Sequence, residues 1–185
     1  MPGTVPRRLL LLRHAKSAWP EEVPDHERPL AGRGRRDAPV AGHWLRSTGK
    51  QPDQAIVSTA RRARETWQLA AAELAAQPSV TFDERVYGAT AGDLLDLARQ
   101  APPGAQSLLI VGHDPAMQDL TLALTDADAE DNAGKLARVR LKFPTAAIAA
   151  LEFTGSWQKL GPGRARLTAF VTPRELQASG GADVT

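Results

Sequence analysis

Three short apolar segments of this sequence are each followed by side chains suited to phosphate chemistry. The side chains concerned are Arg13, His14, Arg62 and His113. A neutral imidazole can attack phosphorus, since its ordinary pKa of about 6.5 leaves it largely unprotonated near neutral pH. Guanidinium groups suit phosphate because their planar fork donates two parallel hydrogen bonds and stays charged. With a second imidazole as a hydrogen-bond donor, these four residues could transfer a phosphoryl group without a metal or a cofactor.

The same residues also have less specific interpretations. A single histidine is more often a surface or hydrogen-bonded residue, and neighbouring arginines more often belong to a solvated helix face. Placement favours function here, because Arg13 stands immediately before His14 and a glycine stands immediately before His113. Glycine lets the backbone approach a ligand closely. We interpret the other two histidines, His26 and His43, as structural or surface residues.

Apolar runs alternate with helical stretches along the chain, which predicts a three-layer α/β/α sandwich with a mostly parallel central sheet. Strands are expected at residues 8–12, 55–57, 79–82 and 108–111, and helices at 33–48, 60–76 and 93–99. The β-like segments 146–153 and 166–172 would close the sheet as a hairpin. The first six residues are expected to form a loose leader, and the residues after Thr172 are expected to fray.

Ligands of open α/β sheets bind beyond the carboxyl ends of the strands, where loops converge and helix N-termini point inward. Residues 13–17, 58–62 and 112–114 follow three of the expected strands. Because parallel strands end at the same edge of a sheet, we expect the two histidines and two arginines named above to meet at that edge.

The composition is that of an ordinary folded protein, with 185 residues of which 42% are hydrophobic and 24% are charged. This size suits one domain spanning residues 1–185. The absence of cysteine excludes disulfides, thiolate catalysis and cysteine-based metal sites, and it is compatible with the cytoplasm, the expected location. The leucine run at residues 9–12 is too short for an export signal or a membrane span, so no membrane partner is expected.

Together the motifs resemble the histidine phosphatase superfamily, whose signature is Arg-His-Gly near the N-terminus. The segments that carry the resemblance are 12–17 (LRHAKS), 58–66 (STARRARET) and 111–114 (VGHD). Segments 28–37 (RPLAGRGRRD) and 142–146 (KFPTA) look like the small SixA-type phosphohistidine phosphatases. The resemblance covers roughly residues 8–153 and implies one histidine phosphatase domain with a core at about 8–172.

The resemblance implies that His14 becomes transiently phosphorylated, that Arg13 and Arg62 bind the phosphoryl group, and that His113 completes the pocket. No metal and no cofactor are implied. Three further side chains are candidates for substrate contact at the rim of the pocket, namely Lys16, Ser17 and Arg28.

The match identifies Arg62 rather than Arg61 as the phosphate-binding arginine. The family places its arginine four residues after a serine and four before a threonine, as Ser58 and Thr66 stand here. The sequence departs from the signature at Ala15, where glycine is commonest. Alanine also occurs in SixA-like members, so we interpret Ala15 as a mark of the subgroup.

A general acid is the least defined part of the predicted site. Glu84, within residues 82–88, looks like the acid of the phosphoglycerate mutase branch, but a surface glutamate is an equally good interpretation. Asp25 and Asp114 are further candidates, and small SixA-type members often lack a clear acid. A phosphoramidate tolerates that absence better than an alkyl ester, because the medium can protonate its leaving nitrogen near neutral pH.

We therefore expect a metal-independent phosphatase acting on a phosphorylated protein, with a phosphatase for a small phosphorylated metabolite as the alternative. A mutase would need a closed site, and few residues are free to form a lid. The arginine-rich segment 28–36 could instead bind nucleic acid, but it lacks interleaved aromatic residues, so no nucleic-acid partner is expected. A metal-dependent hydrolase fits poorly, because arginines beside the histidines would repel a dication.

Overall fold

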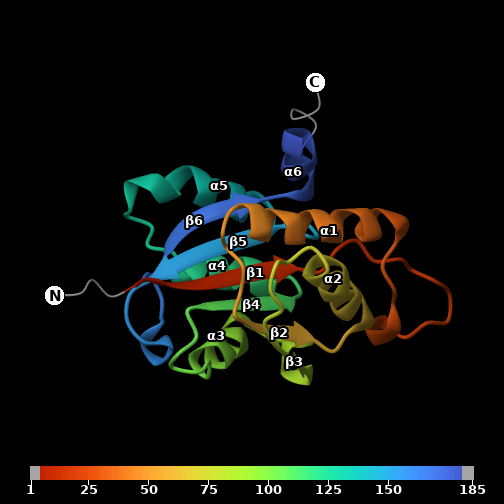
Figure 1. The fold of residues 1–185 in the computed structure, drawn as a ribbon, viewed down its shortest axis with the longest axis horizontal. Coiled ribbons are helices and arrows are strands. Elements are labelled where there is room, and N and C mark those ends of the chain that lie inside the picture. Colours follow the sequence, from red (N-terminus) through yellow and green to blue (C-terminus); the bar gives the residue numbers. More distant parts are fainter. Residues whose placement is uncertain (1–4, 181–185) are drawn as a thin grey trace.

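The computed structural model describes residues 5–180 and places six strands of that region in one sheet. The strands are β1 (Arg7–Arg13), β2 (Gln54–Ser58), β3 (Ser79–Asp83), β4 (Ser107–Gly112), β5 (Ile148–Phe153) and β6 (Arg166–Val171). Their order across the sheet is β3-β2-β4-β1-β5-β6 (Figure 1). The first four strands are parallel, whereas β5 runs antiparallel to β1 and β6 antiparallel to β5. The predicted mostly parallel sheet with a closing hairpin is confirmed.

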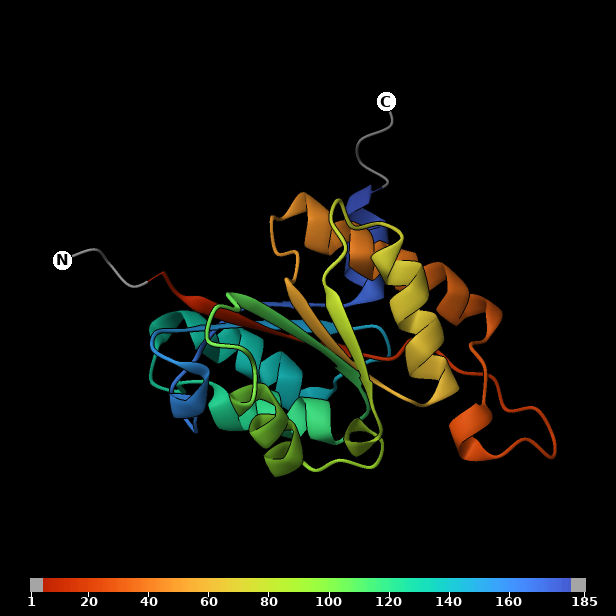
Figure 2. The ribbon, with the colours of Figure 1, turned by 60° about the horizontal axis from the view of Figure 1, so that its bottom comes forward.

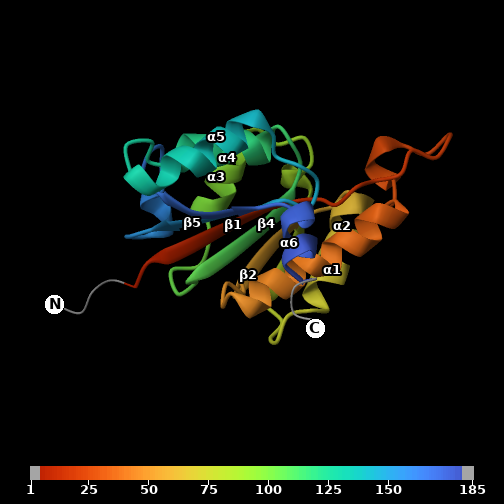
Figure 3. The same ribbon diagram turned by 90° about the horizontal axis from the view of Figure 1, so that it is seen from above.

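Helices cover both faces of the sheet, as the predicted three-layer sandwich requires. The α-helices of the described region are α1 (Gly32–Ser47), α2 (Arg61–Ala71), α3 (Ala91–Arg99), α4 (Ala116–Leu124), α5 (Ala133–Leu141) and α6 (Pro173–Gly180). Figure 3 shows α3, α4 and α5 on one side of the strands and α1, α2 and α6 on the other. None of the helices in residues 5–180 has the length and apolar character needed to cross a membrane.

The leucine run of β1 contributes to both layers of the core. Leu9 and Leu11 pack into the cluster that contains Leu94 of α3, whereas Leu10 and Leu12 pack into the cluster that contains Leu45 of α1. Successive side chains of a strand point to opposite faces, so a strand covered on both sides must be apolar throughout. All four leucines are fully buried, and this fixes β1 in the middle of the sheet.

The register of the parallel strands brings their carboxyl ends to the same edge. Arg13 of β1 lies opposite Gly112 of β4, and Val57 of β2 lies opposite Val111 of β4. The residues that follow these strands therefore enter the same space. The segment between β1 and α1 contains the short 3₁₀ helix η1 (Asp25–Glu27), which extends beyond the sheet beside the first turn of α2 (Figure 2).

The prediction that the chain frays after Thr172 was wrong for the residues that the structure describes. Residues 173–180 form α6, which packs against α1. The Nε2 atom of Gln177 donates a 2.8 Å hydrogen bond to Oδ1 of the buried Asp37 on α1. This hydrogen bond to a buried carboxylate and the packing against α1 hold the segment in place. Residues 1–4, part of the predicted leader, and 181–185 lie outside the described region.

Helix α2 ends at Ala71, five residues before its predicted end. The N–H groups of Glu73 and Leu74 bond to the carbonyls three residues back, those of Ala70 and Ala71. These tighter turns direct Leu74 into the core, where it is buried. Helix α5 was not predicted, because its polar sequence AGKLARVRL contributes only Leu136 and Val139 to the buried core.

Candidate active site

His14 follows β1 directly and is almost fully buried. Its Nδ1 atom lies 2.8 Å from the carbonyl oxygen of Ala15. A carbonyl only accepts hydrogen bonds, so Nδ1 carries the hydrogen and Nε2 keeps its lone pair. The N–H of Ala15 donates to Oγ1 of Thr66 on α2, which holds the turn after β1 against that helix. His14 is therefore fixed in the tautomer of a nucleophile.

Burial lowers the pKa of His14 from 6.5 to about 3, because desolvation penalises the imidazolium form. The hydrogen bond to the Ala15 carbonyl acts in the opposite direction, while the positive charges of Arg62 and Arg13 lower the pKa further. The ring is consequently neutral across the physiological pH range.

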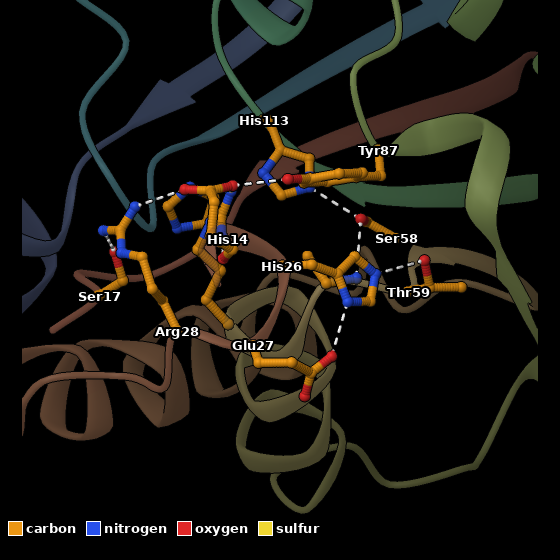
Figure 4. Close-up of polar contacts among 12 residues, drawn as sticks. His14, Ser17, His26, Glu27, Arg28, Ser58, Thr59, Tyr87 and His113 are labelled. Carbon is orange, nitrogen blue, oxygen red and sulfur yellow. Dashed lines mark hydrogen bonds and ion pairs between the residues drawn. The ribbon is translucent and has the colours of Figure 1, made fainter. Parts of the chain in front are cut away.

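His113 follows β4 and faces His14, with the two ring centroids 5.1 Å apart (Figure 4). Its Nε2 atom lies 2.8 Å from Oγ of Ser58 at the end of β2. Its Nδ1 atom is buried and has no hydrogen-bond partner within the described residues. Desolvation and the charge of Arg62 lower the pKa of His113 from 6.5 to about 4. The second ring is thus also neutral and keeps one nitrogen available.

Arg62 lies in the first turn of α2, and its side chain is only 8% exposed. Its Nη1 and Nη2 atoms donate to the backbone oxygen and to Oδ2 of Asp25, at 2.6 and 3.0 Å. The carbonyl of Arg62 accepts a hydrogen bond from the Thr66 hydroxyl, which in turn accepts from the N–H of Ala15. Ser58 and Thr66, four residues before and after Arg62, therefore link the start of α2 to the segments that carry His113 and His14.

Arg13 ends β1, and its guanidinium is held by the segment after α5 and by Asp114. Its Nη1 atom donates to the carbonyl of Phe143 at 2.8 Å and lies 3.4 Å from Oδ2 of Asp114. The turn after α5 bonds to the same strand end, since the N–H of Ala146 donates to the backbone oxygens of Arg13 and His14. Ala146 has a φ of 59°, which allows the turn to make this contact. The KFPTA segment thus supports the strand end that carries His14.

A cavity of about 160 Å³ opens beside His14. Its lining residues are Arg13, His14, Lys16, Ser17, Trp19, Arg28, Arg62 and Thr145. Six of the predicted site residues meet there, and His113 contacts the site through its packing against the His14 ring. Lys16 is exposed, whereas Ser17 is buried and its hydroxyl accepts a hydrogen bond from the Arg28 guanidinium.

The structure does not join Glu84 to this group. Glu84 begins the 3₁₀ helix η2 (Glu84–Val86) and is exposed, and its carboxylate makes no hydrogen bond or ion pair with the site among the described residues. Asp25 does enter the site, but hydrogen bonds from Tyr87, Arg28 and Arg62 hold its pKa well below the ordinary range. Burial raises the pKa of Asp114, whose Oδ2 faces Arg13.

Sequence reasoning missed two aromatic residues at the site. The hydroxyl of Tyr87 donates to Oδ2 of Asp25 at 2.7 Å, and its ring packs edge-on against His113 at 5.6 Å. His26, interpreted as a structural or surface residue, also packs edge-on against Tyr87 and has Nε2 3.0 Å from Oγ1 of Thr59. The segment 82–88, which sequence reasoning singled out for Glu84, also contains Tyr87.

Arg61 and Arg64 are partly exposed, as is usual for neighbouring arginines on a solvated helix face. The Nε atom of Arg61 donates to Glu65 at 2.8 Å, and Nε of Arg64 donates to the carbonyl of Thr59 at 2.9 Å. Across residues 5–180 the structure gathers no three His, Asp or Glu side chains in a geometry that would hold a metal ion. The site is instead a group of neutral imidazoles beside fixed cations, an arrangement that suits an anion.

Comparison with known proteins agrees with this geometry. A sequence profile of the histidine phosphatase superfamily (branch 1) matches residues 9–106. An uncharacterised protein of Mycobacterium tuberculosis is 39% identical over 163 residues, which cover 88% of this chain and 100% of the relative.

Two solved structures resemble the whole fold. A candidate phosphohistidine phosphatase SixA from Nakamurella multipartitia is 31% identical, with a TM-score of 0.78 and coverage of 91% of this chain and 96% of the neighbour. A candidate SixA from Agrobacterium tumefaciens is 30% identical, with a TM-score of 0.75 and coverage of 91% and 99%.

Proposed function

Because the chain belongs to the SixA-type branch of the histidine phosphatase superfamily and is a hydrolytic phosphatase, we propose that it removes phosphoryl groups through a covalent phosphohistidine on His14. The observation that carries this proposal is the state of the His14 ring. Its Nδ1–H is bound to the Ala15 carbonyl and its pKa is about 3, so Nε2 keeps a free lone pair at neutral pH in a ring that lines the cavity.

In the first step the Nε2 lone pair of His14 forms a bond to phosphorus while the bond from phosphorus to the leaving group breaks. The leaving group takes the electron pair of that bond and a proton from the medium. In the second step a water molecule attacks the phosphorus of the phosphohistidine, the P–N bond breaks, and Nε2 recovers its lone pair as inorganic phosphate leaves. No metal and no cofactor enters either step.

The surrounding cations offset the charge that the transferring group carries in the transition state. Arg13, Arg62 and Arg28 line the cavity together with His14. His113 has a buried Nδ1 atom without a partner among the described residues, and this nitrogen is suited to donate a hydrogen bond to a phosphate oxygen. Lys16 and Ser17 also line the cavity and would contact the substrate.

We propose phosphohistidine in a protein as the substrate. The carboxylate of Glu84 makes no hydrogen bond or ion pair with a site residue that the structure describes, and Asp25 is held in its ionised form. Burial raises the pKa of Asp114, but Asp114 is not among the described residues that line the cavity. None of the three therefore provides a ready proton for an alkoxide leaving group. A histidine leaving group does not need one, because its nitrogen can be protonated from water near neutral pH. The likeness to two SixA-type structures supports the same choice. A small phosphorylated metabolite is the alternative substrate, and a cytoplasmic location stays a prediction.

The proposal is tested by trapping the intermediate. Enzyme mixed with phosphorus-labelled phosphohistidine peptide and quenched rapidly should carry an acid-labile, base-stable label that is absent from His14→Ala. His43→Ala, which removes an exposed histidine of α1, serves as the matched control and should keep the label. Label that persists in His14→Ala would show that the nucleophile is another residue.

A substrate panel separates the two substrate classes. We expect the wild-type kcat/KM for phosphohistidine peptides to exceed that for sugar phosphates and nucleotides, and His14→Ala to lose all of these activities together. A preference for the metabolites would replace the phosphoprotein assignment while leaving the intermediate on His14 intact.

A further inference from the structure

Asp25 joins three parts of the site that are remote in sequence. Its Oδ1 accepts a 2.9 Å hydrogen bond from Nη1 of Arg28, while Oδ2 accepts from Nη2 of Arg62 at 3.0 Å and from the hydroxyl of Tyr87 at 2.7 Å. The backbone oxygen of Asp25 accepts a further bond from Arg62. We call Asp25, Arg28, Arg62 and Tyr87 the Asp25 cluster. It connects η1, α2 and the loop after η2.

Asp25 lies on the outer side of the two arginines. Its side chain is 49% exposed, whereas those of Arg28 and Arg62 are each 8% exposed. The described residues that line the cavity beside His14 include both arginines but not Asp25. The carboxylate therefore does not occupy the space into which a phosphoryl group would enter.

Both guanidinium groups keep donors for a ligand. Each has five N–H groups, and Arg62 uses two of them on Asp25. Arg28 uses three, on the carbonyl of Ala18, on Asp25 and on the hydroxyl of Ser17. The bonds to Asp25 thus fix the plane of each guanidinium and leave further N–H groups available.

We propose that Asp25 is a positioning residue, which holds Arg28 and Arg62 in the orientation in which they bind the phosphoryl group in the transition state. This inference rests on the proposed function, since it concerns the same reaction. Arginine side chains are long and flexible, and a guanidinium displaced by about 1 Å can lower a rate on the order of 100-fold. Tyr87 supports the same arrangement, because its hydroxyl bonds to the oxygen that Arg62 also contacts.

Ionisation of the carboxylate is consistent with positioning and not with proton donation. The Tyr87 hydroxyl, Arg28 and Arg62 hold the pKa of Asp25 well below its ordinary range, although desolvation acts in the opposite direction. The negative charge persists through the pH range in which the enzyme would work. It also offsets part of the repulsion between two buried guanidinium groups.

The test compares Asp25→Asn with Asp96→Asn. Asp96 forms an ion pair with Arg99 on α3, away from the cavity, and provides a matched loss of one aspartate charge beside an arginine. We expect Asp25→Asn to lower kcat/KM for phosphohistidine peptide about 10- to 100-fold, and Asp96→Asn to change it less than about twofold. A second variant, Tyr87→Phe, removes one bond to the carboxylate and should cause a smaller loss of about 2- to 10-fold.

Inhibition by inorganic phosphate shows whether the Asp25 carboxylate positions the two arginines or instead hinders the binding of phosphate at the site. Removing a negative charge beside two arginines should by itself strengthen phosphate binding. We expect the inhibition constant of phosphate nevertheless to rise about threefold or more in Asp25→Asn, because the donors lose their orientation. If Asp25 served only to stabilise the fold, the inhibition constant of phosphate would not rise in an Asp25→Asn protein whose thermal unfolding temperature matches that of Asp96→Asn.

A double-mutant cycle completes the test. If Asp25 acts through Arg28, the further loss caused by Asp25→Asn should be smaller in an Arg28→Ala background than in the wild type. An inhibition constant that falls in Asp25→Asn, or an activity equal to that of Asp96→Asn, would overturn the inference. The labelling experiment on the wild-type enzyme separates this inference from the proposed function. If the phosphoryl label forms on His14, the proposed function stands even when the inference fails. If no label forms, the proposed function itself is refuted.

Discussion

The neutral state of His14 makes a quantitative prediction about stability at acidic pH. The folded protein holds the pKa of this ring at about 3, compared with 6.5 for an ordinary histidine. As the pH falls below 6.5, the unfolded chain takes up the proton before the folded protein does, so folding stability decreases. The loss begins near pH 7 and continues down to about pH 3. Above pH 7.5 the two states bind the same number of protons at this site, and the ring adds no pH dependence.

The size of the effect follows from the pKa difference. One pKa unit corresponds to about 1.4 kcal/mol, so between pH 7.5 and pH 4.5 the His14 ring would account for about 2 to 3 kcal/mol of lost stability. His14→Gln removes the titrating group while keeping a side-chain N–H that can reach the Ala15 carbonyl. We therefore expect the variant to lose roughly 2 kcal/mol less than the wild type over this pH interval.

The assay is denaturant unfolding at a series of pH values in phosphate-free buffer of constant ionic strength. Comparing the slopes of stability against pH removes the contributions of carboxylates that both proteins share. His43→Gln, which replaces an exposed histidine of α1, should follow the wild-type slope. Parallel curves for the wild type and His14→Gln would refute the reasoning, because the folded state would then protonate His14 as readily as the unfolded chain does.

Three further predictions concern packing and metal dependence. Gly42→Ala should lower the free energy of unfolding by about 1 to 3 kcal/mol, because a Cβ there would lie 2.0 Å from the carbonyl oxygen of Ala70. In the control variant Gly134→Ala, on α5, the added Cβ meets no atom within 4 Å and should not destabilise the protein. Thermal or denaturant unfolding of the two variants checks this difference. Truncation after Thr172 should destabilise the protein by roughly 1 to 3 kcal/mol, since it leaves the buried Asp37 without Gln177, and an unchanged unfolding midpoint would contradict the docking of α6. Phosphatase activity should be unchanged after dialysis against a chelator, and loss of activity that is restored by added Mg²⁺ or Zn²⁺ would refute the metal-independent mechanism.

The two site histidines that sequence reasoning located share one property, which is their position immediately after an apolar strand. His14 follows four leucines, and His113 follows a strand that is buried throughout. The carboxyl ends of parallel strands meet at one edge, so position along the chain sufficed to bring these rings together. The order of strands and helices was predictable for the same reason, since it depends on local apolar patterns.

Local apolar patterns in the sequence did not predict the helices that contribute few apolar residues to the core. The sequence of α5 provides few buried residues, and α6 is ordered by a contact with α1 that lies 140 residues away in the chain. Neither the few buried residues of α5 nor the contact of α6 with α1 produces a periodic apolar pattern in the sequence. The early end of α2 likewise depends on where Leu74 can be buried, which is a property of the assembled core.

The sequence by itself determined the fold class, the edge of the sheet at which chemistry is possible, and the imidazole and guanidinium groups that meet there. Only the tertiary structure decided the tautomer and neutral charge of His14, the packing of Tyr87 against His113, and the contact of Asp25 with Arg62, 37 residues apart. The physical reason is that the position of a strand end follows from where the strand lies in the sheet, which its run of buried apolar residues encodes locally. Hydrogen bonds and desolvation at a site depend instead on how irregular loops meet, and no local pattern records that.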